Sequence, residues 1–508
     1  MTMLRLLTLA LALALLAPAA RADEVDYLVL VPSALHQAVE PLAAHRAAEG
    51  LSVRVVEVEA VPGRDRRAAL REVVRQARPR FLLIAADARA VPHFDVAETA
   101  TDRPYGDLDD DGLPEVSVGR LPARDAGALS RMVARTVAYE AERAAGAWQR
   151  QCALVAGEGR FGPAVDALIE DMFQRVVART IPPRFDVDLT YANPTSPYCF
   201  PFEGFSRRVV GRVNEGALVV AYVGHGNERS VDSLTVKDAS GREVDYPVLD
   251  ASHVPAIATQ APPVMVAIAC WTGRYEAATP CIGEELLATG RGPVAFFGSS
   301  RISHPVPNAL LGISLVGALF DDAGDDRLGP RLDRARRELV APRSKDEDPL
   351  RAEVLLLSSA FMPREELRRE LPRHVDMYNL LGDPALRLAR PAPLAVEATV
   401  DGEVVTVRGQ APAGARSVTV TLEGPRGRPT RPAPAGETPL ERYARANDRV
   451  LATSLVGVGP DGRFAATLRA PSGAAGAHVV KALATSERGA GAGAAEVTLG
   501  EPGAARRR

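Results

Sequence analysis

The sequence predicts an α/β fold, with a mostly parallel sheet covered by helices on both faces, followed by a small all-β domain. From about residue 26 to about residue 390, apolar runs of strand length alternate with helix-length segments. After residue 390, prolines, glycines and two-residue turn signals replace that pattern. Because runs that are apolar throughout are typical of strands buried on both faces, the first part is expected to contain a parallel sheet.

Seven apolar runs mark the expected strands of this sheet. They lie at residues 27–31, 51–58, 81–85, 152–156, 217–223, 264–269 and 293–298. Between the first two runs, residues 35–49 show helical periodicity that stops at Gly50. Strands separated by helices form βαβ units, and such sheets bind ligands at the carboxyl ends of their strands.

The turn signals after residue 390 indicate short antiparallel strands. Residues 395–400 and 403–407 flank Asp401-Gly402, a dipeptide favoured in tight hairpins. Pro460-Asp461-Gly462 marks a second turn between extended runs. A small all-β sandwich is therefore expected over residues 391–500. Within it, the stretch 424–445 is rich in Pro, Arg and Gly and is expected to be a long loop.

Composition places the chain among globular proteins of several domains. The 508 residues are 46% apolar, which excludes a wholly disordered chain. With 61 basic and 64 acidic side chains the net charge is −3, which provides no argument for nucleic acid or an anionic membrane as partner. The expected divisions are a signal peptide at 1–22, an amino-terminal α/β subdomain at 23–150 and a second α/β subdomain with the candidate catalytic residues at 151–390. An all-β domain at 391–500 and a basic tail at 501–508 follow.

The first 22 residues have the pattern of a signal peptide. Arg5 precedes an apolar run from Leu6 to Ala17, and Ala20-Arg21-Ala22 provides small residues where a signal peptidase cleaves. A membrane anchor is the alternative, but the run is too short to span a bilayer. The mature chain is expected to be exported, extracellular or periplasmic, without a membrane span.

His225 and Cys270 each follow one of the buried strands. The run ending at Val223 leads into Gly224-His225-Gly226, and the run ending at Ala269 leads into Cys270. Attack on a carbonyl by cysteine requires a thiolate and a nearby imidazole. We interpret Cys270 as the nucleophile and His225 as its general base. The alternative is that each is a structural residue, a small core cysteine and a loop histidine.

An oxyanion hole is expected beside this pair. The N–H of Gly226 and the N–H of Cys270 could both point at a developing negative charge. The other three cysteines have no spacing typical of a zinc site. Cys152 and Cys281 are expected to be buried thiols, and the disulfide state of Cys199 stays open.

Several segments resemble the gingipain-type cysteine peptidases. They are YVGHGNE, VAIACWTGRYE, CIGEELL, GPVAFFGSSR and NLLGDPALRL, and further upstream FLLIAADARAVP, DRPYGDLDDDGLPEVSVGRLPA and TVAYE. The resemblance covers residues 26–390. It implies a caspase-like fold with Cys/His endopeptidase activity, and an immunoglobulin-like sandwich commonly follows the catalytic part in that family.

The resemblance also implies roles for individual residues. His225 matches the family's general base, Cys270 its nucleophile and Gly226 its oxyanion-hole glycine. Glu158 falls where the family has an acidic partner of the histidine, which would hold the imidazole in place; the alternative is a solvated loop carboxylate. Substrate-binding roles are expected for Trp271 and His304, the latter from the resemblance alone.

One departure concerns specificity. The arginine-specific members have an aspartate in the specificity pocket shortly after the acidic partner, whereas residues 159–163 here contain no carboxylate and include Arg160 and Phe161. The resemblance therefore does not imply cleavage after arginine, and an uncharged or acidic residue is expected before the scissile bond. Asp166, on the following helix, is the residue that would overturn this expectation.

An acidic stretch indicates a calcium site. Asp107, Asp109 and Asp111 alternate before Gly112, and oxygen ligands at alternate positions suit Ca²⁺. The stretch is not a complete EF-hand loop, since Val118 stands where the final bidentate glutamate would be. The alternative is an acidic surface turn. No organic cofactor is expected.

The sequence therefore predicts a secreted cysteine endopeptidase that cleaves peptide bonds through a thioester at Cys270. Two alternatives remain. One is a catalytically silent binding or adhesion module on the same fold, although retention of both reactive residues argues against silence. The other is a cysteine transpeptidase or amidase, because acyl transfer through a thioester requires the same pair. The expected partner is a protein or peptide substrate.

Overall fold

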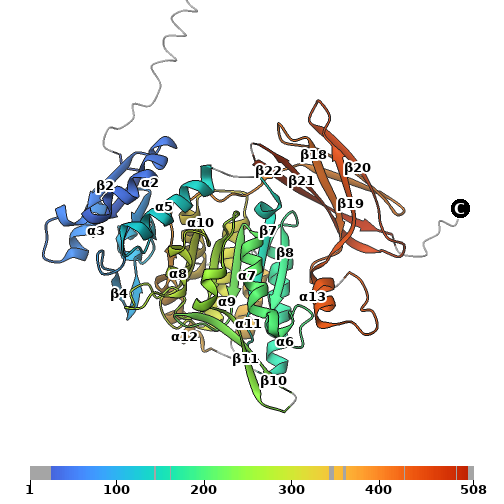
Figure 1. Ribbon diagram of the computed structural model, residues 1–508, viewed down its shortest axis with the longest axis horizontal. Helices are drawn as coiled ribbons and strands as arrows, with labels where there is room; N and C mark the ends of the chain where they lie inside the picture. The colour runs from blue at the N-terminus through green and yellow to red at the C-terminus, as the bar shows by residue number, and fades with distance from the viewer. Residues whose placement is uncertain are drawn as a thin grey trace, which may run out of the picture.

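A computed structural model describes residues 24–500 except 142–144, 161, 239, 342–347, 359–361, 428–429 and 488. The predicted signal peptide and basic tail lie outside the described residues. Figure 1 shows the α/β part at one side and an all-β domain at the other. Among the described helices, none combines the length and the apolar character needed to cross a membrane.

The α/β part is built on one ten-stranded sheet in the order β2-β1-β3-β6-β14-β13-β12-β9-β7-β8. Its strands are β1 (Tyr27–Val31), β2 (Val53–Glu57), β3 (Phe81–Ile84), β6 (Ser117–Arg120), β7 (Gln151–Ala156), β8 (Asp186–Tyr191), β9 (Val219–Val223), β12 (Val264–Ile268), β13 (Ala295–Ser299) and β14 (Tyr378–Leu381). All neighbouring pairs except β13–β14 are parallel. The predicted mostly parallel sheet is confirmed.

The sheet has a seam between β6 and β14, where a single residue pair, Leu381 with Arg120, joins the two strands. β14 runs parallel to β6 but antiparallel to β13. The strand direction therefore reverses between β14 and β13, one strand beyond the seam. The carboxyl ends of β9 and β12 belong to the second side, together with β7, β8 and β13.

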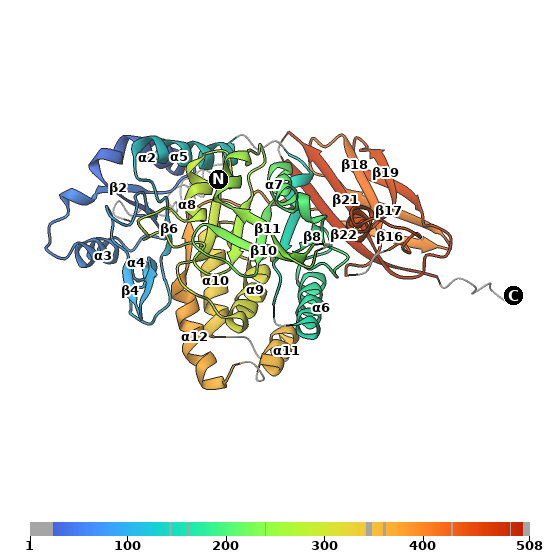
Figure 2. The same ribbon diagram turned by 60° about the horizontal axis from the view of Figure 1, so that its bottom comes forward.

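Helices cover both faces of the sheet, as predicted, and Figure 2 shows the two layers on opposite sides. One layer contains α2 (His36–Ala48), α3 (Arg66–Ala77), α5 (Ala126–Ala141), α7 (Phe205–Glu215) and α8 (Ile282–Ala288). The other contains α6 (Pro163–Thr180), α9 (Pro305–Phe320), α10 (Leu328–Val340), α11 (Pro349–Ser358) and α12 (Arg364–Met377). Short helical turns are α4 (Arg103–Gly106), η1 (Ser33–Leu35), η2 (Val58–Ala60), η3 (Ala147–Arg150), η4 (Phe202–Gly204) and η5 (Ala251–Ala256).

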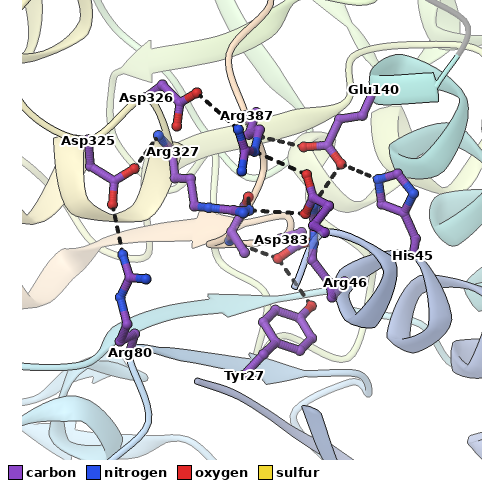
Figure 3. Close-up of polar contacts among 12 residues, drawn as sticks. Tyr27, His45, Arg46, Arg80, Glu140, Asp325, Asp326, Arg327, Asp383 and Arg387 are labelled. Atoms are coloured by element: carbon purple, nitrogen blue, oxygen red, sulfur yellow. Dashed lines mark hydrogen bonds and ion pairs between the residues drawn. The ribbon is translucent and has the colours of Figure 1, made fainter. Parts of the chain in front are cut away.

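A buried ionic network holds the two sides of the seam together (Figure 3). Asp383, directly after β14, accepts hydrogen bonds from Arg46 Nε at 2.9 Å, Arg46 Nη2 at 2.7 Å and the Tyr27 hydroxyl at 3.1 Å. Arg46 Nη1 also lies 2.7 Å from Glu140 Oε2 on α5. Because an unpaired buried charge is costly, each of these groups depends on its partners.

Two hairpins project from the sheet and were not expected from the sequence. They are β4 (Phe94–Val96) with β5 (Thr99–Thr101), and β10 (Ser230–Lys237) with β11 (Glu243–Asp250). The second begins five residues after His225 and projects from the body in Figure 1. Its position beside the carboxyl end of β9 brings its first residues close to the candidate site.

The all-β domain is a sandwich of two sheets, as predicted, and their strands are antiparallel except for the short β15–β22 pair. One has the order β15-β22-β21-β18-β19 and the other β16-β17-β20. The strands are β15 (Ala392–Pro393), β16 (Val396–Asp401), β17 (Val404–Gln410), β18 (Ser417–Glu423), β19 (Val450–Gly457), β20 (Arg463–Arg469), β21 (Gly476–Ser486) and β22 (Gly489–Leu499). Alternating side chains of both sheets fill a separate hydrophobic core.

The stretch 424–445 is not entirely a loop, because its last part enters α13 (Pro439–Asn447). Thr438 caps this helix, its side chain accepting from the N–H of Glu441. Asn447 then bonds both the N–H and the carbonyl of Leu189 on the edge strand β8, at 2.8 and 2.9 Å. The high Pro and Gly content concealed the capping pattern, and the docking depends on tertiary contacts.

Candidate active site

His225 and Cys270 lie side by side because of the register of two neighbouring strands. β9 and β12 are parallel and adjacent, and their last residue pair is Val223 with Ile268. His225 and Cys270 each come two residues after that pair. The carboxyl ends of parallel strands meet at one edge of a sheet, so both side chains belong to the same edge.

Gly226 allows the two loops to approach closely. A Cβ atom at this position would lie 2.9 Å from the carbonyl oxygen of Cys270 and 2.9 Å from the Cβ of Ala269. Any larger residue would push the histidine loop away from the cysteine loop. The glycine is therefore required by packing at this point.

The N–H groups of Gly226 and Cys270 have no backbone acceptor in the described part of the chain. Gly226 pairs with Val231 in an isolated bridge, whose bonds run from Asn227 N–H to Ser230 and from Asp232 N–H to His225. In a pair of this type the N–H of Gly226 itself points away from its partner. Both donors thus remain available to a ligand.

The thiol of Cys270 contacts the segment after β13. The N–H of Ser303 lies 3.4 Å from Sγ, and the Ser303 hydroxyl lies 3.8 Å from it. Asn308 donates to that hydroxyl at 2.8 Å and accepts from the hydroxyl of Tyr378 at 2.7 Å. An N–H donor at this distance would stabilise the negative charge of a thiolate.

Cys270 is more exposed to solvent than the other cysteines. All four are free thiols, and Cys270 alone is not fully buried. Burial raises the pKa of Cys152, Cys199 and Cys281, so these thiols are poorly suited to nucleophilic chemistry.

The imidazole of His225 is exposed, and its Nε2 lies 3.3 Å from the carbonyl oxygen of Gly159. Gly159 belongs to the loop that follows β7. A carbonyl oxygen only accepts hydrogen bonds, so this contact places a proton on Nε2. Nδ1 then remains as the basic nitrogen.

Glu158 lies in the same loop, but its carboxylate is directed toward β10. Burial raises its pKa, which the positive charge of Arg160 and the backbone N–H of Thr235 counteract. Within the described residues, no ion pair or hydrogen bond joins Glu158 to His225. Burial raises the pKa of Asp232, on β10, and the positive charges of Arg160 and His225 counteract that rise.

Trp271 directly follows Cys270, and His304 directly follows Ser303, whose N–H lies 3.4 Å from the thiol. Trp271 follows Cys270 with φ 56°, a left-handed conformation uncommon for a large side chain, and its N–H donates to the carbonyl of Arg301 at 3.1 Å. The His304 side chain is 40% exposed, and its backbone N–H donates to His374 at 3.0 Å. The substrate-binding roles expected for Trp271 and His304 stay predictions.

The acidic stretch brings together Asp107, Asp109 and Glu115, whose ligand oxygens lie within 4.8 Å of one another. Oδ1 of the buried Asp107 has no hydrogen-bond partner among the described residues. Asp111 lies outside this group, and its carboxylate accepts the N–H of Leu113 at 2.7 Å. Glu115 therefore occupies the third position that the sequence pattern assigned to Asp111.

Two residues of the site were missed by sequence reasoning. Ser303 contacts the thiol, and the only sequence signal was its position beside His304. Asp232 is charged yet buried within a strand of otherwise alternating character, which is a signal of a special environment. Phe161, expected near the specificity pocket, lies outside the described residues.

Solved structures share the fold along nearly the whole chain. The complex of Porphyromonas gingivalis RgpB pro- and mature domains has a TM-score of 0.54 at 14% identity, covering 93% of this chain and 100% of that one. The Arg specific cysteine proteinase gingipain R (RGPB) has a TM-score of 0.54 at 15% identity, covering 95% and 99%. No curated protein matches the sequence significantly.

The sequence profile of peptidase family C25 matches residues 20–389, which is most of the chain and includes both candidate catalytic residues. The matched region ends where the all-β domain begins. This chain belongs to peptidase family C25, the gingipain family of cysteine peptidases.

Proposed function

We propose that the chain is an endopeptidase with Cys270 as nucleophile and His225 as general base. The observation that carries this proposal is the strand register, which sets both residues two positions beyond the last pair of β9 and β12. Further support comes from Cys270 being the one cysteine that is not fully buried. The expected substrate is a protein or peptide.

In the proposed reaction, Nδ1 of His225 takes the proton of the Cys270 thiol. The sulfur attacks the peptide carbonyl, and the N–H groups of Gly226 and Cys270 stabilise the oxyanion. The C–N bond breaks as the imidazolium returns its proton to the leaving amine, which leaves a thioester on sulfur. Water, deprotonated by the imidazole, then attacks the thioester and releases the carboxylic acid and the free thiol.

For specificity, we propose that cleavage after arginine or lysine is weak. A basic side chain in a pocket requires a carboxylate partner. Arg160 already takes one nearby carboxylate, lying 2.9 Å from Asp232 Oδ1, and its Nε lies 3.7 Å from Glu158. A dominant arginine or lysine signal that disappears in Asp166→Ala would show that Asp166 provides the missing charge.

A digest of a mixed peptide library by the purified protein tests both proposals. Mapped internal cleavage sites, absent with Cys270→Ala, would establish endopeptidase activity and report the residues around the scissile bond. Products joined to a new amine would instead indicate a transpeptidase. No cleavage or transfer by the wild-type protein would favour the silent binding module.

We further propose that the protein is exported and that its mature chain begins near Asp23. The support is the charged, apolar and small-residue pattern of the first 22 residues. Amino-terminal sequencing of protein recovered outside the cytoplasm tests this proposal. Cytosolic protein that begins at Met1 would contradict it.

We also propose that Asp107, Asp109 and Glu115 hold a structural Ca²⁺. Carboxylate oxygens are the ligands that calcium prefers, and the unpartnered Oδ1 of buried Asp107 fits a cation better than an ordinary acidic turn. Arg103 pairs with the other oxygen of Asp107, so the site carries less negative charge than its carboxylates alone would give.

A further inference from the structure

Asp232 is a buried carboxylate with one oxygen left unpaired. Its Oδ1 accepts from Arg160 Nη2 at 2.9 Å and from the N–H of Ser233 at 2.8 Å. Its Oδ2 is buried and has no hydrogen-bond partner among the described residues. A polar atom in that state usually has a functional or structural cause.

The loop after β7 packs directly on this oxygen. A Cβ atom on Gly157 would lie 2.9 Å from Asp232 Oδ2 and 2.6 Å from the Tyr222 hydroxyl. The absence of a side chain at Gly157 therefore allows the loop to lie against the carboxylate. Arg160 ties the other end of the same loop to Asp232 and to the carbonyl of Ser233, at 2.7 Å.

Asp232 is also joined to the backbone of His225. The N–H of Asp232 donates to the carbonyl of His225 at 3.2 Å. The Tyr222 hydroxyl donates to the same carbonyl at 2.8 Å and accepts the N–H of Asp232 at 3.3 Å. Asp232 and His225 are thus held in a fixed relation.

The electrostatics agree with this arrangement. Burial raises the pKa of Asp232, whereas the positive charges of Arg160 and His225 lower it. An ionised carboxylate at this place attracts a positive charge on the nearby ring. The other titratable groups around the pair are Glu158, which faces Asp232, Tyr222 on β9 and Cys270 after β12.

We propose that Asp232, together with the carbonyl of Gly159, positions and stabilises the imidazolium of His225, the role expected for the Glu158 carboxylate. Asp232 acts in two ways: its negative charge favours the protonated ring, and its ion pair with Arg160 holds the loop whose carbonyl orients Nε2. Asp232 is a positioning residue and does not touch the substrate. This inference rests on the proposed function.

Alkylation of Cys270 tests the inference without requiring turnover. The full chain is treated with iodoacetamide at about pH 6 and about pH 9, and labelling of Cys270 is followed by mass spectrometry. In Asp232→Asn the ratio of the Cys270 alkylation rate at pH 6 to that at pH 9 should fall about tenfold. The reason is that the imidazolium, which stabilises the thiolate, no longer has the negative charge of Asp232 beside it. The buried Cys152, Cys199 and Cys281 should stay unlabelled while the protein is folded.

Glu158→Gln is the matched control, since it removes a neighbouring carboxylate from the same loop. Its alkylation ratio should stay within about twofold of the wild type. A ratio unchanged in Asp232→Asn, or lowered about tenfold in Glu158→Gln, would overturn the inference. If the wild-type protein does not cleave peptides, the endopeptidase proposal fails, but the alkylation ratios still decide the role of Asp232.

A measurement on the unmodified chain covers the case in which Asp232→Asn does not fold. Imidazole nitrogen shifts from histidine-labelled protein report which ring nitrogen carries the proton, and His225→Gln identifies the signal. At about pH 8 the neutral ring should carry its proton on Nε2, as the Gly159 contact requires. A proton on Nδ1 would overturn the inference.

Discussion

The seam of the sheet and the edge near Cys270 differ in how completely their polar side chains are paired. At the seam, the buried guanidinium of Arg46 has three carboxylate partners: Asp383, Glu140 and Glu49. At the edge, the exposed imidazole of His225 has one hydrogen bond among the described residues, and the Cys270 thiol is hydrogen-bonded there only to Ser303. Charges that hold a fold together must be paired, whereas groups that react must be left open to a substrate.

Replacing Cys270, the proposed nucleophile, should distinguish the two regions most clearly. Cys270→Ala should lower peptidase activity by about four orders of magnitude or more, because the thioester cannot form. Its thermal unfolding should change little, since a small residue at a partly exposed position is replaced by another small one. Activity assays and melting curves on one preparation check both parts. Retained activity would exclude Cys270 as nucleophile.

The opposite result is expected at the seam. Asp383→Asn removes the charge that Arg46 contacts through Nε and Nη2, leaving a buried guanidinium undercompensated. The free energy of unfolding should fall by about 3–5 kcal/mol. Urea unfolding measures the loss.

Asp326→Asn is the control for this prediction. Asp326 belongs to the rim of the same network (Figure 3), is 57% exposed, and lies 3.6 Å from Arg387. Its melting temperature should stay within about 2 °C of the wild type. If both substitutions destabilise equally, burial is not what makes the seam sensitive.

The proposed calcium site is a third kind of site, in which the partner of the carboxylates is an ion bound from solution. Removing Ca²⁺ with a chelator should lower the melting temperature, since a ligand at 100 times its dissociation constant stabilises by about 2.7 kcal/mol. Asp107→Asn should abolish this response. Asp110→Asn should keep it, because Asp110 pairs with Arg71 and Arg75 instead. A melting temperature indifferent to Ca²⁺ would leave an ordinary acidic turn.

The smallest expected effect concerns Glu284, which is buried like a seam residue but incompletely paired. Burial raises its pKa to about 7, well above the usual value for glutamate. The folded state therefore favours the neutral acid. Its contribution to stability is complete below the unfolded pKa, near 4.5, and is lost as the pH rises through about 7.

Glu284→Gln should remove this dependence, because glutamine stays neutral and still accepts the N–H of Cys281, which now lies 2.8 Å from Oε2. Relative to wild type, the variant should gain about 2 kcal/mol on going from pH 5 to pH 8. Urea unfolding at the two pH values measures the gain. Glu285→Gln, which affects a partly exposed ion pair with Arg229, should show no such gain.

Most strands could be predicted because their signal is local. The expected runs at 27–31, 81–85 and 264–269 agree with β1, β3 and β12 to within a residue. β6 was missed because its sequence, Ser-Val-Gly-Arg, is short and polar. It can be buried as a strand because the guanidinium of Arg120 donates hydrogen bonds to Asp102 and to backbone carbonyls inside the protein. These bonds offset the cost of burying its charge, and the sequence pattern does not reveal them.

By itself, the sequence determined that two buried strands end beside His225 and Cys270, because hydrophobic periodicity and the end of a strand depend on neighbouring residues. Only the tertiary structure decided that Asp232 is hydrogen-bonded to the backbone of His225 and paired with Arg160. Glu158 and Asp232 are both acidic residues near strand ends, and their roles depend on how the β10–β11 hairpin packs on the loop after β7. Likewise, only the folded chain shows that Glu115, and not Asp111, lies beside Asp107 and Asp109, because the turn at Gly112 determines which carboxylate oxygens come together. Contacts between distant segments depend on packing, which has no local signature in the sequence.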